Sequence, residues 1–323
     1  PGRRVKRAVL LFALIVAAWP AVAAPRLRLA SWNLEWLMTP ATFDRLAGHC
    51  LGARRARDGE RALPCDLVPR GRWSEADFAR LRVFAASAAP DVVALQEVDG
   101  PQAAALVFPR HGFCFTRRRQ LQNVGFAIRR GIPYRCNTDH RALAPRGSGV
   151  RYGADVTLFP GTAQELRLLA VHLKSGCPAG KLSAAREACG VLQRQVPALE
   201  DWIDRRAAEQ ARFAVIGDFN RHLDREGSVA RDTSGRTVAL WPEINDGEPP
   251  GALLVNAGAE QRRTGCATRH DGRPAVDHIV LGRELAPALV TGSFRAWPWP
   301  EPGRWPDHCL ISIELDLESY HGL

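Results

Sequence analysis

Four short segments of the sequence place polar, potentially reactive side chains at or just after apolar runs. They are SWNLEW at 31–36, LQEV at 95–98, GDFN at 217–220 and PDH at 306–308. Carboxylate and amide oxygens bind hard divalent cations, and histidines transfer protons and donate hydrogen bonds to phosphate. Together the segments predict the site of a metal-assisted phosphodiesterase.

The acidic and amide residues follow strand-like runs. Glu97 ends the apolar stretch 92–95, where a buried carboxylate is costly without a partner, so we interpret it as a metal ligand. Asn33 is expected to orient Glu97 or to touch the metal. Asp218 and Asn220 lie two positions apart and can project to one side, toward a water, a phosphate oxygen and the cation. Taken singly, each has a plainer interpretation as an exposed strand end or a turn.

The histidines supply proton chemistry. His172 ends a strand-like run, with Lys174 on the same side, and beside a phosphate it would donate a proton or bind an oxyanion, although a single histidine is more often structural. Asp277 and His308 are predicted to pair, because a carboxylate bonded to one imidazole nitrogen makes the other a general base. His278 should face away from Asp277, and we interpret it as structural.

Strands and helices must gather these residues in one place. Patterning predicts strands over 27–34, 91–98, 125–129, 154–158, 166–172, 214–216, 276–281 and 310–317. One helix is expected between the cap Ser74 and Pro90, and another over 182–210. Residues 41–72 are expected to be an irregular Arg-rich insertion, and 221–274 to be polar surface loops. This mixture predicts an α/β fold with sheets of mixed direction.

Composition and the N-terminus bound the class of protein. The chain has 323 residues, 46% of them hydrophobic, which is enough for a single domain over 24–323 rather than two. Residues 1–23 have a basic start, an apolar stretch and the sequence Ala21-Val22-Ala23, which predicts a cleaved signal peptide and a secreted or periplasmic protein. An uncleaved membrane anchor is the alternative.

Charge points to a polyanionic partner. Removing residues 1–23, which hold four basic and no acidic residues, lowers the formal net charge from +10 to +6. The remaining basic residues are nearly all Arg, which suits bidentate phosphate contacts. A base-composition bias of the genome would explain much of the Arg count, but not the net charge.

The eight cysteines are an even number, which behind a signal peptide predicts disulfides in an oxidising compartment. Among many possible connectivities the simplest joins neighbours: Cys50–Cys65, Cys114–Cys136, Cys177–Cys189 and Cys266–Cys309. The last would help to hold Asp277 near His308. A buried free thiol is the alternative for Cys309.

The segments VHLKSGC, GDFNR, LQEV and the final Asp-His pair resemble the endonuclease/exonuclease/phosphatase family, most of all its secreted bacterial branch. This family includes pancreatic-type deoxyribonuclease, abasic-site endonucleases, bacterial sphingomyelinases and inositol polyphosphate phosphatases. The resemblance covers roughly residues 26 to 317. It implies a DNase I-like four-layer sandwich, with two packed mixed β-sheets flanked by helices and the site at one end.

The resemblance also implies a bound Mg²⁺, or Mn²⁺ in its place. Its metal residues would be Glu97, Asn33 and Asp307. The catalytic residues implied are His172, Asp218, Asn220, Asp277 and His308. The residues implied to bind the substrate phosphate are Arg151, Lys174 and Asn220.

Two positions depart from the family pattern. The usual Ser before the final Asp-His is Pro306, which removes a hydroxyl and a backbone donor. Where deoxyribonuclease-like members have a Glu that supports the first His, this chain has Gln120 and Gln122. We therefore expect His172 to lack a carboxylate partner, which weakens its acid role more than its phosphate contact.

The leading hypothesis is a secreted, divalent-metal-dependent phosphodiesterase that hydrolyses nucleic acid, most simply DNA, by water attack on phosphorus. The Arg clusters at 54–61 and 117–119 suit a polyanion, and we expect a monomer with no protein partner. The alternative is a phospholipid or sphingomyelin phosphodiesterase or a phosphatase, with Trp297, Trp299 and Trp305 touching a membrane rather than packing under a loop. A non-catalytic binding protein on the same fold is a third hypothesis, against which the complete acidic and imidazole set argues.

Overall fold

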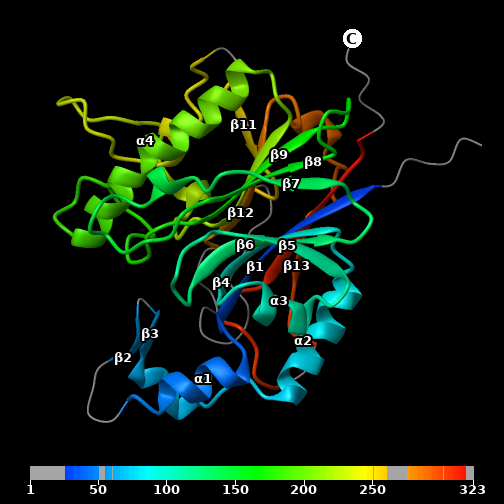
Figure 1. The fold of residues 1–323 in the computed structure, drawn as a ribbon. Coiled ribbons are helices and arrows are strands. Elements are labelled where there is room, and N and C mark those ends of the chain that lie inside the picture. Colours follow the sequence, from blue (N-terminus) through cyan, green and yellow to red (C-terminus); the bar gives the residue numbers. More distant parts are fainter. Residues whose placement is uncertain are drawn as a thin grey trace, which may run out of the picture.

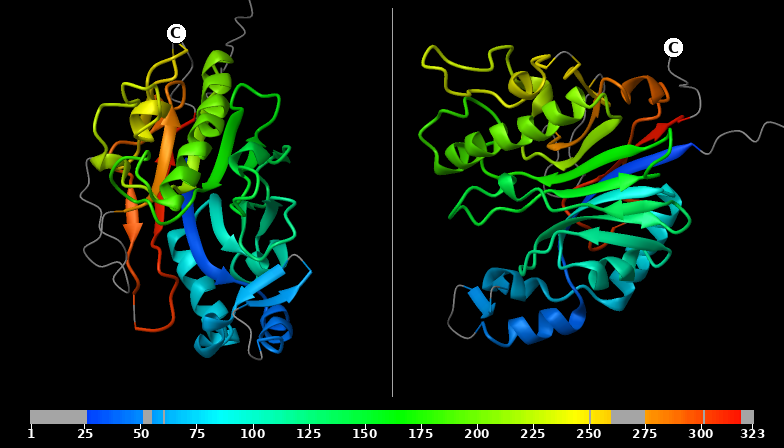
Figure 2. Two further views of the ribbon diagram at one scale, coloured as in Figure 1. Left: turned by 90° about the vertical axis from the view of Figure 1, so that its left-hand side faces the viewer. Right: turned by 45° about the horizontal axis from the view of Figure 1, so that its top comes forward.

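Two six-stranded mixed sheets pack face to face, with helices on the outer face of each (Figure 1). The computed structural model describes residues 26–50, 55–59, 61–249, 251–259, 275–300 and 302–317. The predicted signal peptide, residues 1–23, and Cys266 lie outside these ranges. The predicted four-layer sandwich is therefore confirmed, and the views in Figure 2 show its layers.

The first sheet has the order β13-β14-β1-β4-β6-β5. Its strands are β1 (Leu27–Leu37), β4 (Val92–Val98), β5 (His111–Phe115), β6 (Asn123–Arg129), β13 (Arg295–Trp297) and β14 (Leu310–Leu315). The central strands β1 and β4 run parallel, and β14 and β6 pair antiparallel beside them. Parallel pairing at the centre brings the ends of β1 and β4 to the same edge.

The second sheet has the order β11-β12-β10-β9-β8-β7. Its strands are β7 (Tyr134–Cys136), β8 (Ala154–Leu158), β9 (Leu166–His172), β10 (Phe213–Asp218), β11 (Leu254–Asn256) and β12 (Asp277–Gly282). Strands β9 and β10 run parallel, and β12 pairs antiparallel with β10. Both sheets therefore have two parallel strands at their centre, with polar residues at or near the ends of these strands.

Helices cover the outer faces because the sheets are apolar on both sides, as expected for strands buried on both faces. The helices α2 (Glu75–Ala88) and α3 (Pro101–Val107) cover the first sheet, and α4 (Glu187–Ala208) covers the second. Helix α2 begins at the predicted cap Ser74, whose side chain and that of Asp77 each bind the backbone of the other. None of the helices in the described ranges is both long and apolar enough to cross a bilayer.

The insertion at 41–72 is more ordered than predicted. It contains α1 (Pro40–Ala47), the hairpin of β2 (Arg55–Asp58) and β3 (Arg61–Pro64), and the 3₁₀ helix η1 (Cys65–Arg70). These elements project from one end of the sandwich, at the lower left of Figure 1, around a small apolar core of their own. The two strands and the 3₁₀ helix are too short to give a usable periodicity. Helix α1 did have a start signal, the cap Thr39 followed by Pro40, which the sequence reasoning did not use.

The segment 221–274 is also more structured than the predicted loops. It contains the 3₁₀ helix η3 (Leu223–Arg225), the short helix α5 (Trp241–Ile244) and strand β11. Leu240, Ile244 and Leu254 are buried in the same apolar cluster as α4. Two further 3₁₀ turns are η2 (Arg141–Leu143) and η4 (Ala286–Ala288).

Three predicted disulfides are confirmed, namely Cys50–Cys65, Cys114–Cys136 and Cys177–Cys189. Cys309 is disulfide-bonded and is therefore not the free thiol that was the alternative. Its predicted partner Cys266 lies outside the described residues.

Candidate active site

Strand register explains how residues far apart in the sequence meet. Asp218 at the end of β10 pairs directly with His172 of β9 on one side and with Asp277 of β12 on the other. In the first sheet Asn33 of β1 pairs with Gln96 of β4, one residue before Glu97. The site therefore forms at strand ends, as predicted.

Asp218 connects the two sheets. Its Oδ2 accepts a hydrogen bond of 3.1 Å from the Asn33 amide, which belongs to the other sheet. The same oxygen lies 3.3 Å from His172 Nε2 and 3.9 Å from His308 Nε2. Its Oδ1 accepts a hydrogen bond of 2.8 Å from the Asn220 backbone. One buried carboxylate thus faces both histidines, and burial raises its pKa.

Asp277 and His308 are in direct contact, as predicted from the sequence. His308 Nδ1 lies 2.7 Å from Asp277 Oδ2. Burial alone would lower the pKa of His308, but the charges of Asp277 and Asp218 and the hydrogen bond outweigh it and hold the pKa well above its usual value. Such an imidazole is a strong base at its other nitrogen, Nε2.

His172 has the opposite environment. It is buried, and burial together with the positive charges of Arg151, His308 and Arg118 holds its pKa well below the usual value. Its Nε2 faces carboxylates, while its Nδ1 has no hydrogen-bond partner among the described residues. The lowered pKa favours the neutral imidazole. Nδ1 lacks a partner among the described residues, but the Asp218 carboxylate lies 3.3 Å from Nε2, so His172 is not without a carboxylate neighbour.

The two glutamines near His172 have other partners. Gln122 Oε1 accepts a hydrogen bond of 2.5 Å from Arg151 Nη2. Gln120 accepts one from Arg118. Gln122 thus fixes the guanidinium of Arg151 instead of the imidazole.

Glu97 has the surroundings of a metal ligand. Its Oε1 is 3.9 Å from Arg151 Nη2 and 3.9 Å from His172 Nε2, beyond hydrogen-bond distance. Its carboxylate accepts no hydrogen bond from the described residues, and only 16% of the side chain is exposed. A mostly buried carboxylate with unfilled acceptor positions fits a hard divalent cation.

The other two predicted metal residues, Asn33 and Asp307, already lie close to polar groups of the protein. Asn33 Oδ1 accepts a hydrogen bond of 3.1 Å from the Glu35 backbone, and its amide nitrogen is used by Asp218. Asp307 Oδ1 lies 4.0 Å from His308 Nε2. Asp307 is thus at the site, and Asn33 is placed to orient its neighbours as much as to bind an ion.

A second possible metal group differs from the predicted one. Ligand-type atoms of Asp218, Asp277 and His308 lie within 4.8 Å of one another. His308 Nδ1 is already bound to Asp277, however, so an ion between them would break the pair. We interpret these three residues as the proton-transfer side of the site, and Glu97, which lies near His172 and Arg151, as the carboxylate that suits a cation.

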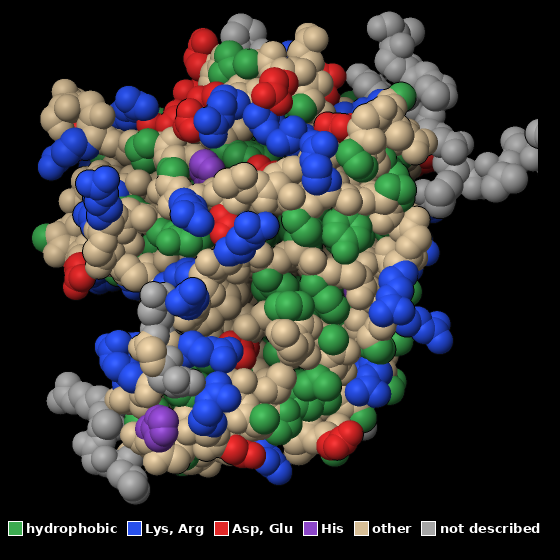
Figure 3. Space-filling model, viewed as in Figure 1, with side chains coloured by type: hydrophobic (Ala, Val, Ile, Leu, Met, Phe, Trp, Pro, Cys, Tyr) green, Lys and Arg blue, Asp and Glu red, His purple; other side chains and the backbone are tan. Residues whose placement is uncertain are grey.

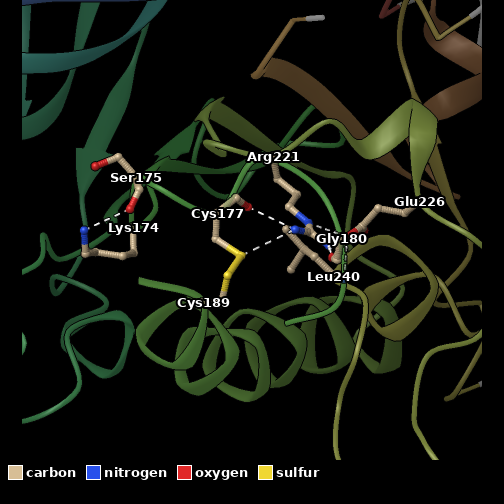
Figure 4. The surroundings of a disulfide bond; sticks show 8 residues. All are labelled: Lys174, Ser175, Cys177, Gly180, Cys189, Arg221, Glu226 and Leu240. Atoms are coloured by element: carbon tan, nitrogen blue, oxygen red, sulfur yellow. Dashed lines mark hydrogen bonds and ion pairs between the residues drawn. A yellow bond between two sulfur atoms is a disulfide. The ribbon is translucent and has the colours of Figure 1, made fainter. Parts of the chain in front are cut away.

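Two of the predicted phosphate-binding residues differ in how the structure places them. Arg151 is buried beside Glu97, and its charge acts on His172, so it lies within the site. The Lys174 ammonium donates to the backbone oxygen of Ser175 at 2.9 Å (Figure 4). Lys174 uses one of its three N–H donors in this bond, and Arg151 is held inside the site by Gln122.

Backbone strain is concentrated at this site. Glu97 and Asn220 have φ angles of 59° and 53°, in the left-handed region that non-glycine residues rarely adopt. Gly217 has φ 146°, and a Cβ there would lie 2.1 Å from the Val171 oxygen. Only glycine fits the approach of β10 to β9, which explains the first residue of GDFN.

Arg221 is a residue whose role the sequence reasoning missed. It is buried, and its guanidinium donates to the backbone oxygens of Cys177 and Gly180 and pairs with Glu226 (Figure 4). Asn220 donates at 3.1 Å to the Leu173 oxygen. The GDFN turn is thus fastened to the disulfide loop after His172. The Arg of GDFNR was the available signal.

The interpretation of His278 as structural is confirmed by its contacts. It is fully buried, and its Nε2 lies 2.8 Å from the Arg221 oxygen. Its other nitrogen lies 3.3 Å from the Asn256 amide. His278 therefore supports the GDFN turn from behind.

The tryptophans before the final Asp-His pack inward. Trp299 and Trp305 stack with centroids 5.0 Å apart, and Trp305 is 6% exposed. Trp297 and Trp299 pack on the apolar cluster of the first sheet, and Trp297 donates to the Ser312 hydroxyl. Trp305 is buried and the other two are partly buried, which favours the packing interpretation of these side chains.

Basic side chains surround a recess in the molecular outline. In Figure 3 the left side is hollowed between the sandwich and the projecting insertion, and Lys and Arg side chains gather around that hollow. At the site itself, the charges of Arg118 and Lys174 act on His172.

The family comparison covers most of the chain. Residues 30–317 match the model of the Endonuclease/Exonuclease/phosphatase family. A search of curated proteins found no match.

Solved structures share the fold. One is the AP endonuclease LMAP from Leishmania major, with 17% identity, a TM-score of 0.53, and coverage of 90% of this chain and 88% of that one. Another is the 3′ phosphatase NExo from Neisseria bound to product DNA hairpin, with 15% identity, a TM-score of 0.53, and coverage of 90% and 99%. The human Nocturnin catalytic domain with bound sulfate anion has 13% identity, a TM-score of 0.53, and coverage of 90% and 93%.

Proposed function

The chain belongs to the Endonuclease/Exonuclease/phosphatase family, and from this premise we propose that it is a secreted, Mg²⁺-dependent phosphodiesterase of nucleic acid, with DNA as the first candidate. The observation that carries the proposal is the hydrogen-bonded Asp277–His308 pair, which faces Asp218. Glu97 lies near His172, the other histidine that Asp218 faces. A base and a separate open carboxylate are what hydrolysis of a phosphodiester by water requires.

The base side of the mechanism follows from the contacts. His308 accepts a proton from the attacking water at Nε2, and Asp277 stabilises the imidazolium that results. Asp218 and Asn220 orient the water and a phosphate oxygen from the neighbouring strand end. Because Asp218 already faces His308 Nε2 at 3.9 Å, a water between them would have an acceptor on each side.

The phosphate side is held by groups with fixed protonation. Arg151 offers its charge to a phosphate oxygen, and neutral His172 offers the proton on Nε2 to a second oxygen or to the leaving group. Glu97, Asp307 and Asn33 would hold the divalent cation. When bound, that cation supplies charge stabilisation to the phosphate.

Nucleic acid is favoured over lipid by charge and by the tryptophans. Basic side chains gather around the recess. Trp305 is buried, and Trp297 and Trp299 are partly buried against the apolar cluster of the first sheet. Among the described residues, the large exposed hydrophobic side chains are four aliphatic ones and no aromatic one: Val83, Val229, Leu253 and Val255. One relative of the same fold was solved with a DNA hairpin product, which agrees with this choice of substrate.

A side-by-side assay tests the substrate. The purified chain is given Mg²⁺ and plasmid DNA, RNA, sphingomyelin or a soluble phosphate monoester, with chelator as control. We expect nucleic acid to be cleaved, only with the cation, and more slowly as salt rises, because Arg contacts release counterions. Faster turnover of sphingomyelin or of the monoester, or activity that survives chelation, would overturn the proposal.

Export is a separate part of the proposal. Three described disulfides and a bonded Cys309 suit an oxidising compartment. Fractionation of cells that express the full chain should find it outside the cytoplasm and shortened near residue 24. A cytoplasmic, uncleaved chain would contradict export without affecting the proposed chemistry. We also expect a monomer with no protein partner.

A further inference from the structure

A small pocket lies beside the candidate site, between the insertion and the segment that leads to His308. Its volume is about 190 Å³. Three tryptophans line it, together with two arginines. The lining residues used below are Trp36, Trp73, Trp305, Arg70 and Arg304. None of them has a role in the proposed hydrolysis.

Both walls of this pocket lead directly into the site. Trp36 comes three residues after Asn33, and Trp305 comes two residues before Asp307. Consecutive Cα atoms are about 3.8 Å apart, so each wall lies within roughly 8–11 Å of a site residue along the chain. The pocket is thus lined by the same two segments that carry Asn33 and Asp307.

The size and the lining fit one flat ring. Pockets for drug-sized ligands usually measure roughly 300–1,000 Å³, so this one is too small for lipid acyl chains. The Arg304 guanidinium lies 4.2 Å from the Trp73 ring centroid and donates to the backbone oxygens of Arg70, Gly71 and Arg72. Because Arg304 covers Trp73, and Trp299 and Arg80 lie over Trp305, a base would contact the fixed Arg304 guanidinium and the edges of these rings.

Charge distinguishes a base from a choline headgroup. Aromatic pockets also bind quaternary ammonium ions. Here the wall has the two guanidinium groups of Arg70 and Arg304 against the single carboxylate of Glu35, which Arg70 already binds at 2.9 Å. A net positive wall repels a cationic headgroup and accepts a neutral ring that is attached to phosphate.

We propose that this pocket is a subsite for one unpaired nucleobase next to the phosphate that is hydrolysed. The inference rests on the proposed nuclease function and specifies its substrate. A base inside a duplex is paired and stacked, so it must leave the helix to enter such a pocket. The enzyme should therefore prefer single-stranded or frayed ends over intact duplex.

Binding to the unchanged full chain tests the subsite without hydrolysis. Deoxyadenosine monophosphate, deoxyribose 5-phosphate and phosphocholine are titrated in chelator, and tryptophan fluorescence and heat are recorded. We expect the nucleotide to bind about tenfold more tightly than the other two, within the roughly 5- to 150-fold that stacking one base contributes. Equal affinities for the nucleotide and the base-free sugar phosphate would overturn the subsite. Tighter binding of phosphocholine would assign the pocket to a lipid headgroup instead.

A pocket-filling variant sharpens the test. Leu67 lines the pocket from η1, so Leu67→Trp should occupy it, while Val68→Trp adds a ring on the same helix away from the lining. We expect the nucleotide's advantage to vanish only in Leu67→Trp. If that variant unfolds, as thermal melting will show, the ligand comparison on the unchanged chain decides the question.

Strand cleavage separates this inference from the proposed function. A single-stranded oligonucleotide and a strand of equal length without bases are compared with Mg²⁺. Leu67→Trp should lower kcat/KM about tenfold on the first and leave the second unchanged. Equal losses on both strands would reject the subsite while the nuclease function stands. Cleavage of neither strand by the unchanged chain would reject the nuclease function, and nucleotide binding would still decide the pocket.

Discussion

The two sides of the site hold histidines in opposite states. On one side His308 is bonded to Asp277 at 2.7 Å, and its pKa is held well above the usual value. On the other side His172 is buried beside Arg151, with Nδ1 unpartnered among the described residues, and its pKa is held well below it. Asp218 faces both rings.

The difference shows that environment, not residue type, assigns the chemistry. A histidine with a carboxylate at Nδ1 takes up a proton readily, so it suits the water that must be activated. A histidine that stays neutral keeps one N–H to donate across the pH range, so it suits the phosphate or the leaving group. The predictions below test whether the two sides are as distinct as their surroundings imply.

The largest expected effect is on the His308 side. Asp277→Asn should lower kcat on the order of 10⁴-fold, the loss known for the same change in a Ser-His-Asp triad. A base must be unprotonated, so wild-type activity should rise with pH until the raised pKa of His308 is passed. Losing the carboxylate charge lowers that pKa, so the rising limb of the pH–rate profile should move to lower pH.

The matched control is Asp201→Asn. Its carboxylate is 58% exposed and lies on helix α4, which carries no residue of the candidate site. It should leave both rate and profile unchanged. An Asp277→Asn enzyme with a normal rate and an unshifted limb would mean that His308 is not the base.

The cation side should be next. Glu97→Gln keeps the size of the side chain but removes its negative charge and one of its two oxygen ligands. Hydrolysis should fall by about 10³-fold, because a bound metal contributes several kcal/mol to such reactions. Mg²⁺ binding, measured by calorimetry, should weaken in parallel. Glu209→Gln, at an exposed carboxylate, is the control. Unchanged Mg²⁺ affinity in Glu97→Gln would place the ion elsewhere, with Asp218, Asp277 and His308 as the next candidate.

A smaller effect is expected at His172. His172→Ala removes a donor to the phosphate and should cost on the order of 10²-fold in kcat. His172→Gln retains an N–H donor, so it should recover part of that loss. Neither variant should move the rising limb that belongs to His308 by as much as Asp277→Asn does. If the Gln variant is as inactive as the Ala variant and the limb disappears, His172 titrates in the reaction and the two sides are not distinct.

The smallest effect on rate is expected from the disulfide behind His172. Replacing Cys177 and Cys189 with Ser opens a link between positions 12 apart and should lower the free energy of unfolding by about 2–4 kcal/mol. It should also lower kcat a few-fold, because Arg221 holds the GDFN turn to the Cys177 oxygen. The control removes Cys114–Cys136, which should lower stability alone. Equal rates for both double variants would show that Arg221 positions the turn without the disulfide.

The sequence was sufficient for much of the site. Glu97, His172 and Asp218 stand at the ends of apolar runs, and runs of that kind form central strands whose ends meet at one edge. The contact of Asp277 with His308 and three disulfides between neighbouring cysteines were also predicted correctly. The short elements of the insertion and of 221–259 were missed, because most of them are three to six residues long and show no clear period.

What the sequence by itself determined about this protein is its family, its sandwich of strands and helices, and the residue types at the strand ends. Local patterning and motif spacing are properties of the chain and need no third dimension. Only the tertiary structure decided which carboxylate faces which histidine, that Gln122 serves Arg151, and that Trp36 and Trp305 share a pocket. Those facts depend on register between strands and on burial, and the pKa values of His172 and His308 diverge because distances and desolvation, not residue names, set the energy of a charge.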